Sequence, residues 1–487
     1  MKFLLKYPVH FPFLFFRIWL SCIFLAILQV AGAQEILVAP YLQPGNAPDL
    51  DKEEKVIIWQ TDDVVGNFKV EFSEGASFSE NKEAKINSVR LNFPGASSKL
   101  YRARLKNLKF DSSYFYRVSL NNLILAEHSF NTRSRTSRTR FAVFADVGAG
   151  SDAQAAIAYR VWLQEPQFVL IPGDVAYNSG RAAEYRYRFF PYYLSPVASP
   201  EKGAPLLQGI PFYMMLGNHD VYSYDLDEFP DGLAYFYYSD LPRNAPVVKG
   251  VIVPEGEIKN IKEFERNASP QYPGISNYSF KTGNVHVTVL DGNSYVNPLD
   301  PKLVEWIRQD LGKSEADWKI VAYHQAAFSA GPDHAGYQLM RLLSPLLEEV
   351  GVDVVFSGHE HNYQRSLPLR FKPAVNESGT QYLVSEEGSV EGAFEYDTGF
   401  DGKTNTVAKG IIYIITGAGG GTLYGPELTD HPEFWEKETS ESLEHYTAKL
   451  VSDRHSFTLI ETNGKELVLK QIDAEGNVFD EIKISKK

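Results

Sequence analysis

The sequence predicts an α/β domain preceded by an all-β domain, and three patterns along the chain support this prediction. Residues 35 to 133 form short alternating runs of apolar and polar residues, separated by turn residues. After residue 138, apolar runs alternate with amphipathic, helix-like segments such as AQAAIAYRVWLQE and YQLMRLLSPLLEEV. From about residue 410 to 487 the strand pattern returns. Regular short strands are typical of a sandwich, whereas strands that alternate with helices form a sheet buried on both faces.

The composition is that of an ordinary globular protein. The chain has 487 residues, of which 44% are hydrophobic and 22% charged, which is enough for two or three domains. Its single cysteine, Cys22, lies in an apolar run near the N-terminus. The chain after this run therefore has no disulfide and no cysteine ligand, so that any metal must be held by oxygen and nitrogen.

The first 33 residues have the layout of a cleaved secretory signal. Lys2, Lys6 and Arg17 precede the apolar run from Ile18 to Val30, and small residues follow it, so we expect cleavage after Ala33 and a secreted or periplasmic protein. A retained anchor is the alternative, because a long aromatic stretch and a charge precede the apolar run. Without residues 1 to 33 the chain carries 45 basic and 61 acidic residues, a net charge of −16. Such an acidic chain is not expected to bind nucleic acid, and after cleavage no membrane association is expected.

The strand runs between residues 35 and 133 predict a β-sandwich of about 100 residues. Runs such as KVIIWQT, NFKVEFS and SSYFYRVSL are the expected strands. Trp59, Tyr114 and Tyr116 fit the core of this sandwich better than they fit a binding site. Residues 132 to 140, TRSRTSRTR, form a basic polar run without an apolar face, which we interpret as the linker to the next domain.

Polar clusters follow five of the buried-strand runs in the α/β region. The runs are FAVFAD, FVLIPGD, FYMMLGNHD, IVAYH and VDVVFSGHEH. Binding sites in open α/β sheets lie outside the carboxyl ends of the strands, so these clusters are expected to converge at one edge. Together they supply seven oxygen and nitrogen donors, a number that suits two metal ions sharing a carboxylate. The seven are Asp146, Asp174, Tyr177, Asn218, His324, His359 and His361.

Each of these residues also has an ordinary structural interpretation. Asp146 and Asp174 precede tight turns and are suited to capping them, and Asn218 is suited to capping a helix. Tyr177 and His324 are also compatible with a hydrogen-bonded core. These alternatives stay open for each residue alone, but five clusters of this kind at five strand ends favour a shared site.

The five clusters resemble the signature of the calcineurin-like metallophosphoesterases. Tyr177, three residues after Asp174, is similar to the pattern of the purple acid phosphatase branch. The resemblance covers about 220 residues, and the matching blocks are DVG (146 to 148), GDVAY (173 to 177), GNHD (217 to 220), VAYH (321 to 324) and GHEH (358 to 361).

This resemblance implies a fold and a division into domains. The family has an α/β/β/α metallophosphoesterase sandwich, and the segment that begins near PYLQ resembles its fibronectin-III-like N-terminal domain. We therefore expect a signal peptide over residues 1–33, a fibronectin-III-like sandwich over 35–133, and a catalytic domain over 138–487 with a C-terminal β extension from about 410.

The resemblance also implies a dinuclear metal centre with distinct ligands for its two ions. Asp146, Tyr177 and His361 would hold Fe(III), and Asp174 would bridge to the second ion. Carboxylates and a phenolate suit a hard trivalent ion, whereas imidazoles and an amide suit a divalent one. The second ion would be Zn, Fe(II) or Mn, held by Asn218, His324 and His359.

The implied activity is that of an acid phosphatase that hydrolyses small phosphate monoesters with a metal-bound hydroxide as nucleophile. His219 and His334 are the family's candidate proton donors, and Asp220 is expected to orient His219. The segment QAAFSAGPDHAG around His334 departs from the usual proline of the family. One alternative is a phosphodiesterase or nucleotide hydrolase on the same centre. The other is a cell-surface binding protein whose catalytic site is degenerate.

Overall fold

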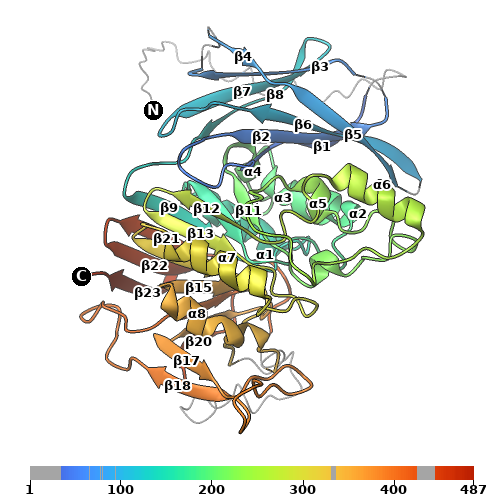
Figure 1. Ribbon diagram of the computed structural model, residues 1–487. Coiled ribbons are helices and arrows are strands. Elements are labelled where there is room, and N and C mark those ends of the chain that lie inside the picture. The colour runs from blue at the N-terminus through green and yellow to red at the C-terminus, as the bar shows by residue number, and fades with distance from the viewer. Residues whose placement is uncertain are drawn as a thin grey trace, which may run out of the picture.

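The computed structural model describes residues 34–487 except 65, 77, 79, 94, 331–335 and 425–444. The predicted signal peptide and His334 lie outside the described residues. An N-terminal pair of sheets sits on top of a larger α/β body, and the C-terminal strands belong to that body (Figure 1). In the part of the chain that is described, no helix combines the length and the apolar character needed to cross a membrane.

The N-terminal region consists of two four-stranded sheets that face each other. Trp59 and Tyr116 are fully buried between them, and Trp59 stacks on Tyr101 with ring centroids 5.1 Å apart. The predicted aromatic core is therefore present. In spatial order the first sheet is β1 (Ile36–Gln43), β2 (Lys55–Asp62), β6 (Ala96–Leu105) and β5 (Ile86–Phe93). The second is β4 (Lys82–Glu83), β3 (Phe68–Glu74), β7 (Ser113–Leu120) and β8 (Leu123–Asn131).

The α/β body contains two larger sheets, with parallel strands at one edge of the first and in the middle of the second. One has the order β11 (Phe212–Met214), β10 (Phe168–Ile171), β9 (Arg138–Val143), β21 (Ser456–Asn463), β22 (Glu466–Asp473) and β23 (Val478–Ser485). The other has the order β12 (Tyr278–Thr282), β13 (Val285–Val289), β14 (Trp318–Ala322), β15 (Val354–Ser357), β19 (Ile412–Thr416), β16 (Tyr363–Ser366) and β20 (Thr447–Val451). The parallel strands are β11, β10 and β9 in the first sheet and β13, β14, β15 and β19 in the second. The C-terminal strands thus extend both sheets.

Alternation along the strands explains why the body has four layers. In β14, Ile320 faces the core between the two sheets, whereas the next residue, Val321, faces the helices. Phe168 of one sheet meets Phe280 of the other with ring centroids 5.4 Å apart. The outer helices are α1 (Asp152–Trp162) on one side and α7 (Pro301–Gly312) with α8 (Ser344–Glu349) on the other, as Figure 1 shows for α7 and α8. The predicted α/β/β/α architecture is confirmed.

Shorter elements fill the connections. The tyrosine-rich run LAYFYYSDLP, residues 233 to 242, contains α5 (Tyr235–Tyr238), whose side chains are all buried, next to α6 (Ile258–Ala268). The segment 366–409 contains a two-stranded sheet of β17 (Leu369–Pro373) and β18 (Gly392–Tyr396). The remaining short helices are α2 (Ala182–Glu184), η1 (Tyr185–Phe189), α3 (Phe190–Tyr193), α4 (Leu206–Gly209), η2 (His219–Val221) and η3 (Leu339–Leu343).

The segment between the two regions is anchored rather than free. Arg133 is only 7% exposed and forms an ion pair with the buried Glu53, which also pairs with Lys55. The same guanidinium donates to the carbonyl of Lys281 at 3.0 Å. Polar composition suggested a linker here, but the basic side chains are used to fasten the sandwich to the α/β body.

Candidate metal centre

The five predicted strand ends meet at one edge of the two large sheets. Each polar cluster begins two to four residues after the end of β9, β10, β11, β14 or β15. The side chains of Asp146, Asp174 and His324 are buried, and each offers a ligand atom within 4.8 Å of the others. This trio forms the middle of the site.

Tyr177 joins this trio to His361. Its hydroxyl oxygen lies 2.8 Å from Asp174 Oδ2, 3.0 Å from Asp146 Oδ1 and 2.9 Å from His361 Nε2. His361 Nε2 is itself 3.6 Å from Asp146 Oδ1. Two carboxylates, a phenol and an imidazole therefore point at one small volume.

A second group of donors lies on the other side of Asp174. His324 Nε2 is 3.4 Å from Asp174 Oδ2 and 3.0 Å from Asn218 Oδ1. The rings of His324 and His359 have centroids 5.0 Å apart. The structure thus brings all seven predicted side chains together and places Asp174 between the two groups.

Backbone carbonyls orient two of these imidazoles. His324 Nδ1 lies 2.7 Å from the carbonyl oxygen of Pro172, and His361 Nδ1 lies 2.6 Å from that of Thr422. A carbonyl can only accept, so each Nδ1 carries a proton and each ring directs its Nε2 toward the centre. A histidine that binds a metal through Nε2 needs this ring orientation.

The backbone conformation at three of the seven residues also orients their side chains toward the centre. Asp146, Asp174 and His359 have φ values of 61°, 52° and 72°, in the left-handed region that few residues other than glycine adopt. This backbone conformation costs free energy and persists only where the surrounding structure enforces it. Residues that adopt it are concentrated at functional sites. Gly173 leaves room for His324, since a Cβ at this position would lie 2.5 Å from its Nδ1.

The electrostatics of this cluster fit a cationic occupant. Burial and the neighbouring Asp174 carboxylate raise the pKa of Asp146 well above its usual value, although His324 opposes this shift. Burial also raises the pKa of Tyr177 well above its usual value, and the carboxylates of Asp146 and Asp174 raise it further. Burial lowers the pKa of His361 to about 4, which leaves a neutral imidazole. Positive charge at the centre would relieve both the carboxylate repulsion and the cost of forming the phenolate.

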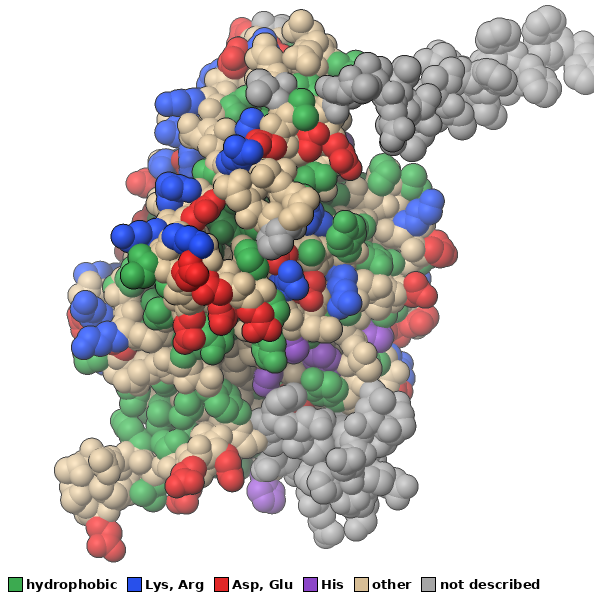
Figure 2. Space-filling model, turned by 90° about the vertical axis from the view of Figure 1, so that its right-hand side faces the viewer, with side chains coloured by type: hydrophobic (Ala, Val, Ile, Leu, Met, Phe, Trp, Pro, Cys, Tyr) green, Lys and Arg blue, Asp and Glu red, His purple; other side chains and the backbone are tan. Residues whose placement is uncertain are grey.

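His219 lies beside the cluster at its solvent side. Its side chain is 33% exposed, and its Nε2 is 3.9 Å from Asp174 Oδ2. Figure 2 shows histidine side chains gathered on one face of the α/β body. Tyr177 and His219 are in ring contact, with centroids 4.5 Å apart. His219 is therefore within reach of a ligand that enters the site from solvent.

The expected role of Asp220 is corrected by the structure. The partner of His219 Nδ1 is the carbonyl oxygen of Asn178 at 2.6 Å, not the carboxylate of Asp220. Asp220 is fully buried and accepts from the backbone amides of Gly217 at 2.9 Å and Val175 at 3.1 Å. It therefore ties together the two loops that carry Asn218 and Asp174.

Several contacts of the centre have no signal in the sequence. The carbonyls of Pro172, Thr422 and Asn178 act through the backbone, so their residue types do not reveal them. Tyr424, which stacks on His361 with centroids 4.3 Å apart and planes within 8°, lies beyond the last signature block. Only its position directly after the glycine-rich GAGGGTL segment points to the site.

The comparison with known families agrees with this geometry. Residues 139–363 match the family model of the calcineurin-like phosphoesterases. An uncharacterized protein of Mycobacterium tuberculosis is 27% identical over 352 residues, which cover 65% of this chain and 60% of the relative. Purple acid phosphatase 21 of Arabidopsis thaliana is 24% identical over 347 residues, which cover 70% of each chain. The chain thus spans about three fifths of the mycobacterial relative's length.

Solved structures show the same fold. A purple acid phosphatase from yellow lupin seeds superposes with a TM-score of 0.58 at 15% identity, covering 92% of this chain and 74% of its own. PhoD superposes with a TM-score of 0.53 at 13% identity, covering 93% and 92%. Residues 139–363 therefore match the calcineurin-like phosphoesterases. Within that class the chain resembles purple acid phosphatases in sequence and shares their fold.

Proposed function

We propose that this protein is a metal-dependent acid phosphatase that hydrolyses small phosphate monoesters outside the cytoplasm. The observation that carries the proposal is the convergence of seven oxygen and nitrogen donors around Asp174, with the half-exposed His219 beside them. The segment that would direct export, residues 1–33, lies outside the described part of the chain.

The two donor groups suit two different ions. Asp146, Tyr177 and His361 present hard oxygen donors and one imidazole, which favours Fe(III), with Asp174 shared between the groups. The amide and imidazoles of Asn218, His324 and His359 favour Zn, Fe(II) or Mn. When bound, such a pair of ions supplies Lewis acidity, which lowers the pKa of water to produce a hydroxide nucleophile and neutralises charge on a phosphoryl group.

We assign protonation of the leaving group to His219. Its Nδ1 donates to the carbonyl of Asn178, so a proton bound at Nε2 would face the centre and could be transferred to the leaving group. Asp220 holds the loop of His219 through the amide of Gly217 and does not touch the imidazole ring. His334, the second proposed proton donor, lies outside the described residues.

A comparison of two substrates tests the proposal. The exported chain should hydrolyse an aryl phosphate monoester with a kcat/KM well above that for a bis-aryl phosphate. A preference for the diester would replace the proposed function with that of a phosphodiesterase. Binding of metal without hydrolysis of either ester would support a non-catalytic binding protein instead.

A further inference from the structure

A lysine-rich pocket lies in the N-terminal sandwich, in a different domain from the metal centre. It has a volume of about 310 Å³ and opens at the edges of both sheets. Lys82 belongs to the edge strand β4, Lys85 directly precedes the edge strand β5, and Lys106 directly follows β6. The pocket is thus built where the chain crosses from one sheet to the other.

The three lysines carry charge that the surrounding protein does not neutralise. Among the described residues, no carboxylate lies within 4 Å of the ammonium groups of Lys82, Lys85 or Lys106. Other lysines of the sandwich are paired, as Lys109 is with Glu74 at 2.6 Å. The unpaired charges therefore gather at the pocket rather than being spread over the domain.

Two further charged residues line the pocket. Arg104 pairs with Glu54 at 3.1 Å and with Asp240 at 2.7 Å, so it belongs to the contact with the α/β body. Glu83 is the one carboxylate of the lining, and it offsets only one of the three lysine charges. The net field inside the pocket is therefore positive, although the chain as a whole carries a formal charge of −13.

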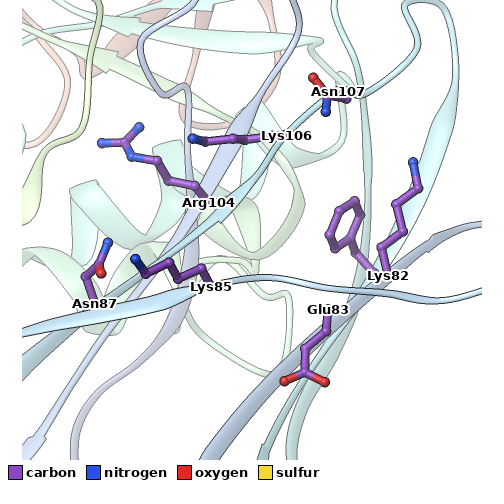
Figure 3. A pocket seen from close by; sticks show the side chains of 8 residues that line it. Lys82, Glu83, Lys85, Asn87, Arg104, Lys106 and Asn107 are labelled. Carbon is purple, nitrogen blue, oxygen red and sulfur yellow. The ribbon is translucent and has the colours of Figure 1, made fainter.

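The cations do not converge on a single point. Figure 3 shows Lys85, Arg104 and Lys106 extending in the same direction, with Asn87 beside Lys85 and Lys82 set apart from them. A single small anion would contact only some of these cations, because Lys82 is set apart from the others. A ligand with several anionic groups along its length can reach cations separated in this way, because adjacent strands are about 4.8 Å apart and successive residues on one face are about 7 Å apart.

The uncharged part of the lining suits a hydroxylated ligand. Asn87 and Asn107 are exposed and offer amide donors and acceptors, and Phe72, which is 4% exposed, forms an apolar wall. Amides beside an aromatic surface suit the hydroxyl groups and the apolar face of a sugar ring. We infer that this pocket binds a short segment of an anionic polysaccharide, and thereby holds the enzyme on a polyanionic glycan.

Binding of defined oligosaccharides to the full chain tests this inference. The probes are oligosaccharides of polygalacturonate and of dextran sulfate, with uncharged dextran of the same length as the reference, and calorimetry at about 0.15 M ionic strength is the readout. At least one anionic probe should bind and dextran should not. Carboxylate and sulfate sources are distinguished by which probe binds more tightly.

Matched variants locate the binding. The triple change Lys82→Gln, Lys85→Gln and Lys106→Gln should weaken binding by about tenfold or more, because three charge contacts are lost. The same charge change at three exposed lysines of the α/β body should leave the affinity unchanged, and both variants should keep aryl phosphate hydrolysis. These control positions are Lys249, Lys262 and Lys313.

Three results would overturn the inference. The first is equal binding by the pocket variant and the control variant. The second is failure of both anionic probes to bind a folded, metal-loaded enzyme. The third is full displacement of the bound probe by inorganic phosphate at the same concentration of charge, which would indicate a small-anion site.

Discussion

The metal centre and the lysine pocket collect charge in opposite ways. At the centre, buried carboxylates, a phenol and imidazoles lie within a few ångströms of one another, and the two carboxylates repel each other unless a cation lies between them. At the pocket, exposed ammonium groups face solvent without partners. Residues 34–133 contain 13 basic and 13 acidic residues, whereas residues 134–487 contain 32 and 48. Burial makes the metal centre dependent on a cation, and exposure leaves the lysine pocket free to attract an anion.

The largest expected effect is the removal of the shared carboxylate. Asp174→Ala should lower metal content and reduce kcat/KM on an aryl phosphate by about 10³-fold or more, because Asp174 serves both donor groups. Elemental analysis and steady-state kinetics measure the two quantities. Asp51→Ala, at an exposed position in the sandwich, is the control and should change neither. Two tightly bound ions in the Asp174 variant would contradict the assigned bridge.

Substitution of His219 tests whether a side chain on the solvent side of the centre acts as the general acid. His219→Ala should reduce turnover by about 10² to 10⁴-fold, the range for loss of general acid catalysis, while the metals stay bound. The loss should be smaller for substrates whose leaving group needs no proton, such as nitrophenolate. An equal loss for good and poor leaving groups would assign His219 to another task.

Substitution of Arg133 tests how the N-terminal sandwich is held to the α/β body. Arg133→Ala leaves Glu53 buried with only Lys55 as a cation, so it should lower the free energy of unfolding by about 3 kcal/mol. The exposed Arg135 provides the matched control, for which Arg135→Ala should cost less than about 1 kcal/mol. Urea unfolding of both variants measures the difference. Equal losses would mean that the buried ion pair does not couple the sandwich to the body.

A smaller, pH-dependent effect is expected at Asp291. Burial raises its pKa to about 6, although hydrogen bonds from Asn293 and Tyr295 oppose the shift. The folded chain therefore binds this proton more tightly than the unfolded chain does. Stability contributed by this group is complete below about pH 4 and falls by roughly 2 to 3 kcal/mol as the pH rises through 6. Asp291→Asn should remove that part of the decline, and an unchanged pH profile would contradict the shift.

Much of the α/β body could be predicted from the sequence, because buried parallel strands are continuous apolar runs. Each run ended close to a polar residue of the site, so Asp146, His324 and His359 could be predicted to lie together, although β9 belongs to one sheet and β14 and β15 to the other. The division into domains and the fibronectin-III-like character of the sandwich stay predictions.

Contacts made by the backbone, or by side chains from distant elements, could not be predicted. Asn178 acts on His219 through its carbonyl, which every residue type possesses. Arg133 was interpreted as part of a linker, because it lies in a basic run without an apolar face. Nothing in that run indicates that Arg133 pairs with the buried Glu53. Lys82 lies in β4 and Lys106 directly follows β6, which belong to different sheets, and strand periodicity does not show that these strand ends meet.

Metal content and visible absorbance, measured on one sample that is also assayed with an aryl phosphate, test the central claim most directly. We predict two ions per chain including iron, a visible band from the Tyr177 phenolate, and hydrolysis of the monoester. Tyr177→Phe should abolish the band without unfolding the protein. Hydrolysis that persists after chelation of all metal, or a chain that binds no metal after supplementation, would contradict the assignment of these seven residues to a catalytic metal centre.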